Sequence, residues 1–182
     1  MNTRSVRRAA LLGVAALVVI GGVAAFGRWL GAAERQEAAA CQQSVHEAEG
    51  KLRTDRWDPP SDLPDLGNYP EIHWQAHSLG CPCSRAPGPT DFAYQGVVRL
   101  KSDDAARLTK QFEFVPFESL DPASLVNLST PAEVWPELRP HLPSDARWLY
   151  SESYDEAGSS PRWRSAFLDL DHQTLLFMLN DH

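Results

Sequence analysis

The chain has 182 residues, of which 43% are hydrophobic and 23% are charged. This length suits one domain with accessory segments, and the composition is that of a folded protein rather than a disordered one. The first 28 residues contain four arginines and no acidic residue, so the rest of the chain contains 13 basic and 24 acidic residues. That part carries no cluster of Lys and Arg, so we expect no nucleic-acid partner and no adhesion of that part to an anionic lipid surface.

The first element in chain order is an apolar run over residues 9–27 that contains no charged side chain. As a helix it would span about 28 Å, close to the hydrocarbon thickness of a bilayer. Three arginines precede the run within residues 1–8, and the positive-inside rule makes this short tail cytoplasmic and the rest of the chain extracytoplasmic. We therefore predict a signal-anchor, a single transmembrane helix that holds the protein in the cell membrane. A cleaved signal peptide is the alternative, because Gly31-Ala32-Ala33 fits a small-residue cleavage site.

Residues 28–53 are predicted to form a helical stalk, because Ala, Glu, Gln and Arg dominate the segment and no Pro interrupts it. Small and apolar side chains recur there at spacings of three and four and form one narrow stripe: Ala38, Cys41, Val45, Ala48 and Leu52. We expect this stripe to make slight contact with the protein's own domain. The alternative is a weak homodimer in which two stripes pair as a short coiled coil. Residues 54–69 are rich in Pro and Asp and follow neither a helical nor a strand period, which predicts a semi-rigid linker.

Residues 70–182 predict an extracytoplasmic α+β domain, built on a small, mostly antiparallel sheet with one or two short helices. A helix should begin around Ser102 and end before Phe114, and a second helical turn should open at Thr130-Pro131. The residue pattern predicts five strands: Glu71–His77, Phe92–Lys101, Ala146–Tyr154, Arg162–Asp169 and Thr174–Asn180. A four-residue connection joins the last two strands, which is typical of an antiparallel hairpin.

This layout resembles that of uncharacterised single-pass exported proteins of GC-rich actinobacteria. The features that carry the resemblance are the basic start, the Ala/Val-rich anchor, the Pro/Asp linker and the small strand-rich domain that ends in a hairpin. The resemblance covers the layout of most of the chain and includes no diagnostic motif. It implies a membrane-anchored, extracytoplasmic protein, and it assigns no activity to any residue.

Four side chains that bind soft or borderline metal ions lie within eleven residues: His73, His77, Cys81 and Cys83. The two histidines are an even number of positions apart, so they point to the same face of a strand. A glycine and a proline beside the cysteines allow the chain to turn back toward that face. Thiolate and imidazole ligands suit zinc or copper, although this spacing matches no established zinc pattern.

A disulfide is the competing interpretation of these cysteines, because exported proteins meet an oxidising compartment. The three cysteines of the chain allow at most one intramolecular bond. Cys81 and Cys83 are favoured by proximity, whereas Cys41 would have to return from the stalk across the linker. We therefore predict a Cys81–Cys83 disulfide and no tightly bound metal or other cofactor.

No nucleophile–base pair and no phosphate-binding loop can be recognised in the sequence. The sequence therefore favours a non-catalytic binding or interaction module held at the membrane, with a protein or cell-envelope partner that the sequence does not identify. The alternative is a metal-binding or thiol-redox protein that uses His73, His77, Cys81 and Cys83. An enzyme with a site assembled from scattered residues is a third class, which motifs do not reveal.

Overall fold

The structure, a computed structural model, describes residues 34–80, 82–83, 91–121, 123, 128–158 and 162–181. The chain divides into two compact units, Met1–Val45 and His46–His182. The anchor predicted over residues 9–27 lies outside the described residues. None of the helices within the described ranges is long and apolar enough to cross a membrane.

The described part of the first unit is helical, and this helix spans residues 34–49. It occupies the middle of the range predicted for the stalk. Its last turn is fastened within the second unit, where Glu49 accepts hydrogen bonds from the backbone N and the Oγ of Ser78 at 2.9 and 2.7 Å. After the helix ends, Arg53 pairs with Trp74 as an isolated β-bridge, so the chain joins the edge of the sheet instead of continuing as a helix.

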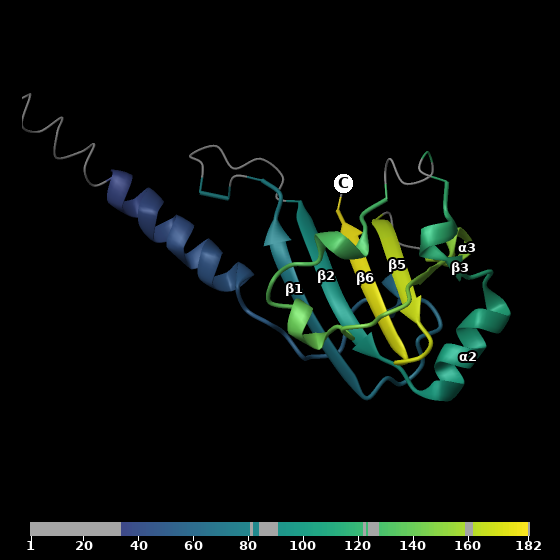
Figure 1. Cartoon of the computed structure of the whole chain (residues 1–182). Helices are drawn as coiled ribbons and strands as arrows, with labels where there is room; N and C mark the ends of the chain where they lie inside the picture. Colours follow the sequence, from purple (N-terminus) through teal and green to yellow (C-terminus); the bar gives the residue numbers. More distant parts are fainter. Residues whose placement is uncertain are drawn as a thin grey trace, which may run out of the picture. The chain divides into compact units, whose positions relative to one another are not determined.

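A six-stranded antiparallel sheet forms the centre of the second unit (Figure 1). The predicted α+β class with a mostly antiparallel sheet is confirmed. In the order β1-β2-β6-β5-β4-β3, the strands are β1 (Glu71–Ser78), β2 (Phe92–Arg99), β6 (Thr174–Asn180), β5 (Trp163–Asp169), β4 (Leu149–Tyr150) and β3 (Val115–Pro116). Two α-helices accompany the sheet, α2 (Ser102–Gln111) and α3 (Glu152–Glu156), and 3-10 turns occupy Pro60–Asp62, Phe117–Ser119, Pro131–Glu133 and Arg139–His141.

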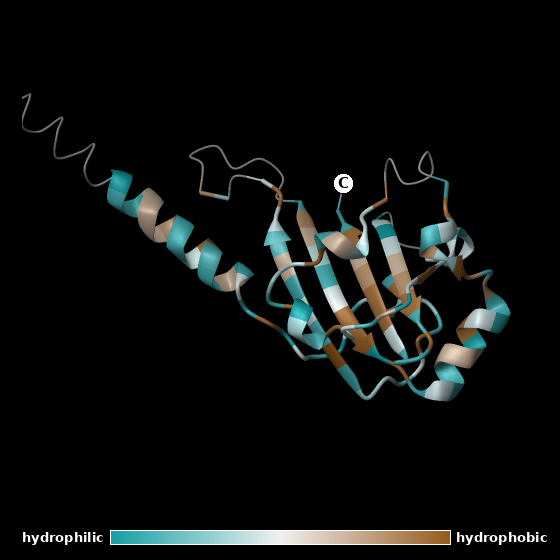
Figure 2. Cartoon of the chain, viewed as in Figure 1, coloured by the Kyte–Doolittle hydropathy of each residue, from teal (hydrophilic) through white to brown (hydrophobic). Residues whose placement is uncertain are grey.

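The central strand β6 is buried on both faces, as its sequence LLFML indicates. It pairs with β5 in a hairpin whose register runs from Asp169 opposite Thr174 to Trp163 opposite Asn180. The predicted hairpin is therefore confirmed. Figure 2 shows that hydrophobic residues concentrate on the central strands. On the neighbouring strand β2, Gly96 is required for close packing, because a Cβ there would lie 2.4 Å from the ring of Phe177.

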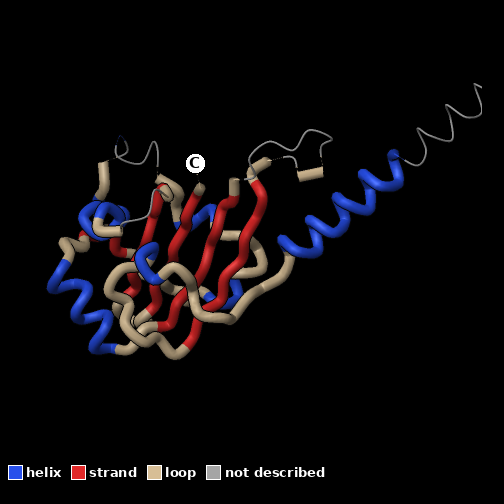
Figure 3. Tube along the Cα trace, turned by 180° about the vertical axis from the view of Figure 1, so that it is seen from behind, coloured by secondary structure: helices blue, strands red, loops and turns tan. Residues whose placement is uncertain are grey.

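The two faces of the sheet carry separate cores. The first core contains Leu175, Phe177 and Leu179 of β6 and is covered by residues 57–66 together with side chains of α2 and α3. The second core contains Leu176 and Met178 of the same strand and is covered by the irregular segment 134–150. Figure 3, seen from behind, shows that loops cross the sheet alongside the helices.

Residues 54–69, predicted as a semi-rigid linker from their Pro and Asp content, also contribute side chains to the first core. Trp57, Leu63 and Leu66 within this segment are at most 4% exposed and belong to the first core. The ring of Trp57 makes edge contacts with Trp74 and Phe177, with centroids 4.9 and 5.2 Å apart. The prolines hold the segment against the sheet as extended chain and a 3-10 turn, so apolar side chains without any period become core residues.

The strand predicted over Ala146–Tyr154 is shorter in the structure. Only Leu149–Tyr150 pairs with β5, and α3 begins immediately afterwards. The Oγ of Ser151 accepts a hydrogen bond from the backbone N of Tyr154 at 3.3 Å, which is the N-cap interaction that starts a helix. The cap formed by Ser151 therefore ends the strand after Tyr150, although the apolar residues of this segment favour a longer strand.

Asp155 in α3 is a largely buried carboxyl group, and burial raises its pKa from 3.8 to about 7. Its Oδ1 accepts a hydrogen bond from the backbone N of Ala166, whereas its Oδ2 has no hydrogen-bond partner among the described residues. A pKa that is higher in the folded state than in the unfolded state means that folding favours the protonated form. Stability contributed by this group is therefore complete below about pH 4 and is lost as the pH rises to about 7.

The Asp155→Asn variant should accordingly be more stable than the wild type at pH 8, by on the order of 2 kcal/mol, because it removes the cost of burying a charge. At pH 4 the two proteins should differ little. Urea unfolding of both proteins at the two pH values measures this difference. An advantage of the variant that is equal at pH 4 and pH 8 would contradict the assignment.

Candidate functional site

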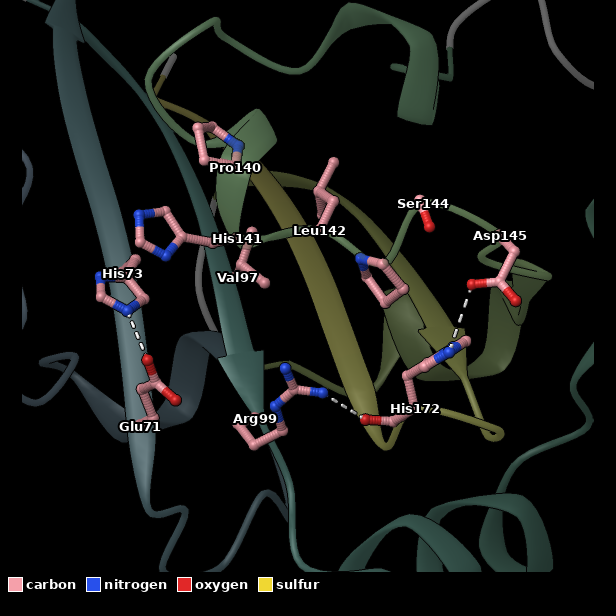
Figure 4. A pocket seen from close by; sticks show the side chains of 11 residues that line it. Glu71, His73, Val97, Arg99, Pro140, His141, Leu142, Ser144, Asp145 and His172 are labelled. Atoms are coloured by element: carbon pink, nitrogen blue, oxygen red, sulfur yellow. Dashed lines mark hydrogen bonds and ion pairs between the residues drawn. The ribbon is translucent and has the colours of Figure 1, made fainter.

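A cavity of about 370 Å³ opens on the second face of the sheet, between strands β1 and β2 and the turn over residues 140–145 (Figure 4). We call it the histidine cavity. Its polar lining consists of three histidines, two carboxylates, an arginine and a serine: His73, His141, His172, Glu71, Asp145, Arg99 and Ser144. Strands β1 and β2 provide three of these groups, Glu71, His73 and Arg99, and turns provide the other four.

Glu71 and His73 lie on the same face of β1 because they are two positions apart. The Nε2 of His73 is 2.7 Å from the Oε1 of Glu71. The His73 ring also stacks on the ring of His141, with centroids 3.7 Å apart and planes inclined by 20°. His141 ends the 3-10 turn Arg139–His141, which is held down by the completely buried Leu138.

The charge states of this cluster follow from its contacts. The hydrogen bond with His73 holds the pKa of Glu71 below its usual value, so Glu71 is a carboxylate at neutral pH. Two effects lower the pKa of His141: the larger is desolvation by burial, and the smaller is repulsion from the nearby His73. The His141 ring is therefore neutral at pH 7. The Nδ1 of His73 is buried and has no hydrogen-bond partner within the described part of the chain. The cluster therefore presents one carboxylate and an imidazole that is not protonated.

The opposite end of the cavity is held by the β5–β6 turn. The buried Asp169 accepts a hydrogen bond from the Nδ1 of His172 at 2.9 Å, and this interaction is the main reason why the pKa of His172 is raised. Arg99 donates hydrogen bonds to the backbone O of His172 and the Oγ1 of Thr174 at 2.7 and 3.1 Å. Arg99 is therefore fixed between this turn and Glu71, which lies directly opposite it in the register of β1 and β2.

Among the described residues, the structure does not bring His73, His77 and Cys83 of the predicted metal site together as ligands. The two histidines do share a face, as expected, but they contact different residues: His77 stacks on Trp135 with centroids 3.7 Å apart. Cys81 lies outside the described residues. Cys83 is held in a disulfide, and a disulfide sulfur is not the thiolate that a zinc ion requires.

The prediction of a disulfide is confirmed, but its pairing requires a correction. The bond joins Cys83 to Cys41, so the predicted Cys81–Cys83 bond does not form. A bond between cysteines two positions apart would close a small, strained ring. Pairing with a cysteine that is distant in sequence avoids that ring, and connectivity of this kind cannot be deduced from spacing alone.

Sequence reasoning missed most of the residues that line the cavity. Glu71 carried a usable signal, because it lies two positions before His73 and therefore on the same strand face. His141 carried none, because its position between prolines follows neither a helical nor a strand period. The stacking partner of His73 is provided by a turn whose placement depends on packing in the second core.

Comparisons with protein-family models, with curated proteins and with solved structures find no match to this chain. Ser144 is the only hydroxyl side chain among the described lining residues of the cavity, and no hydrogen bond within the described part of the chain joins it to a histidine. The cavity thus offers charged and hydrogen-bonding groups without an activated nucleophile.

Proposed function

We propose that the chain is a membrane-anchored, extracytoplasmic binding module that takes a small polar ligand in the histidine cavity. The observation that carries this proposal is the cavity itself. Its volume of about 370 Å³ is within the range of sites for small molecules. Three of its polar groups, Glu71, His73 and Arg99, stand on strands that are fixed by backbone pairing, which lowers the cost of ordering the site on binding.

The location rests on two supports of different kinds. The apolar run over residues 9–27 and the arginines before it favour an anchor with the remaining chain outside. The disulfide between Cys41 and Cys83 is in keeping with an oxidising compartment, because disulfides in cytosolic proteins are rare.

A reporter enzyme fused after His182 tests the location. If the reporter requires an oxidising compartment, it should be active, and the fusion protein should sediment with membranes. Activity of a reporter that works only in the cytoplasm would contradict the proposed orientation. Release of a protein shortened by about 30 residues would show a cleaved signal peptide instead of an anchor.

Binding is tested on the full chain in detergent by NMR of labelled histidine rings. A library of small polar fragments, each at millimolar concentration, serves as the probe. Fragments that fit the cavity should shift the ring signals of His73, His141 and His172 without shifting those of the exposed His46, which is the internal control. If no fragment shifts the cavity histidines more than His46, the binding function is wrong.

A further inference from the structure

The geometry points to a divalent transition-metal ion of the zinc class as a ligand of the histidine cavity, held by Glu71, His73 and His141. This inference rests on the proposed binding function and specifies the class of ligand. The ligand atoms of the three side chains all lie within 4.8 Å of one another. Figure 4 shows the three side chains grouped on one side of the cavity and His172 on the other, with Arg99 between them.

The three residues form a ligand set of known chemistry. Two imidazoles and one carboxylate bind zinc in sites that keep the fourth position open for water or another small ligand. Here that fourth position would face the cavity, since all three residues line it. Imidazole nitrogen favours zinc and copper, whereas magnesium and calcium prefer all-oxygen sites, so the set discriminates against the two common hard cations.

Two of the three ligands are placed by the sheet before any ion binds. Glu71 and His73 project from the same face of β1, which pairs with β2 along its whole length. Their Nε2 and Oε1 atoms are 2.7 Å apart in a hydrogen bond, so zinc binding releases the proton between them to solvent and moves the two atoms slightly apart. Preorganisation of this kind reduces the entropy that metal binding must overcome. The carboxylate of Glu71, whose ion pair is with His73, also gives the ion a compensating negative charge, which Arg99 opposite it on β2 reduces but does not remove.

The third ligand has to turn its ring to complete the site. Ligand nitrogens around a tetrahedral zinc ion are about 3.3 Å apart, shorter than the 4.8 Å limit within which the present atoms lie. The stacked rings of His73 and His141 are inclined by only 20°, so their nitrogen lone pairs lie in nearly parallel planes about one ring thickness apart and do not converge on one ion. Rotation of the half-buried His141 side chain toward the cavity corrects both features without a shift of β1. Loss of the stacking is therefore a signature of metal binding.

Titration of the full chain in detergent with zinc sulfate, followed by isothermal calorimetry and elemental analysis, tests the inference. We expect one zinc ion per chain and none after the same treatment with magnesium sulfate. The Glu71→Gln and His141→Ala variants should each bind zinc at least about tenfold more weakly, since even the loss of an outer-shell partner costs about 10–100-fold. Glu71 is exposed, so its substitution leaves the fold intact, and the melting temperature without metal checks this.

The His77→Ala variant is the matched control. His77 is also a histidine of β1 on the same face, but it stacks on Trp135 outside the cluster, so its removal should leave zinc affinity unchanged. Equal loss of affinity in His77→Ala and His141→Ala, or the absence of stoichiometric zinc in the wild type, would overturn the metal site. If zinc fails while polar fragments still shift the cavity histidines, only the metal inference falls. If both fail, the proposed binding function falls with it.

Discussion

Replacement of Trp57 by Ala should lower the free energy of unfolding by about 3–5 kcal/mol, the usual cost of removing a large aromatic side chain from a core. Trp57 is 4% exposed, and its ring contacts three other aromatic rings of the first core, those of Trp74, Tyr94 and Phe177. Its indole Nε1 also donates a hydrogen bond to the buried Asp62 at 3.2 Å. The substitution therefore leaves both a cavity and a carboxylate with one donor fewer.

Urea unfolding followed by far-UV circular dichroism measures this loss, and Trp163→Ala is the matched control. Trp163 is also a tryptophan at the sheet, but it is 53% exposed, so its removal should cost less than half as much. A Trp57→Ala protein as stable as the wild type would show that residues 54–69 are a spacer, as their composition suggests. A large loss would place the start of the folded unit before this segment instead of at residue 70.

The difference between Trp57 and the strands shows which parts of this fold a sequence reveals. Strand β6 was predictable because a short, unbroken apolar run bounded by turn residues is typical of a strand that is buried on both faces. Trp57 was not, because a single aromatic residue among Pro and Asp has no period that marks a buried face. Its burial is decided by tertiary packing, in which an extended chain crosses the first core.

The candidate site also has a part that the sequence predicts and a part that depends on tertiary packing. The shared orientation of His73 and His77 follows from strand periodicity and was predictable. The partners of these rings come from elsewhere: His141 and Trp135 belong to the irregular segment that covers the second core. That segment is placed by the burial of Val134 and Leu138, and this packing leaves no local pattern in the sequence. The cavity is therefore a product of the covering segment as much as of the sheet.

Arg162 is the second residue whose loss should be severe, because it is the cation that faces a completely buried carboxylate. Its Nη1 contacts the Oδ2 of Asp62, which is 0% exposed, and its Nε contacts the Oδ1 of Asp181. Its guanidinium carbon also lies 4.9 Å from the centre of the Tyr94 ring. Arg162 thereby ties the 3-10 turn Pro60–Asp62 to the C-terminal end of β6 across the first core.

The Arg162→Met variant should lose about 3–5 kcal/mol of unfolding free energy, because it leaves Asp62 buried without its cation while it preserves most of the side-chain volume. The double variant Asp62→Asn/Arg162→Met should regain much of this loss, since the desolvated charge is then absent as well. Arg147→Met is the control, because its pair with Asp171 is 83% and 59% exposed and should change stability by less than about 0.5 kcal/mol. Urea unfolding of the three variants decides the matter. If Arg162→Met is no more damaging than Arg147→Met, the pair with Asp62 does not hold the segment 54–69 to the sheet.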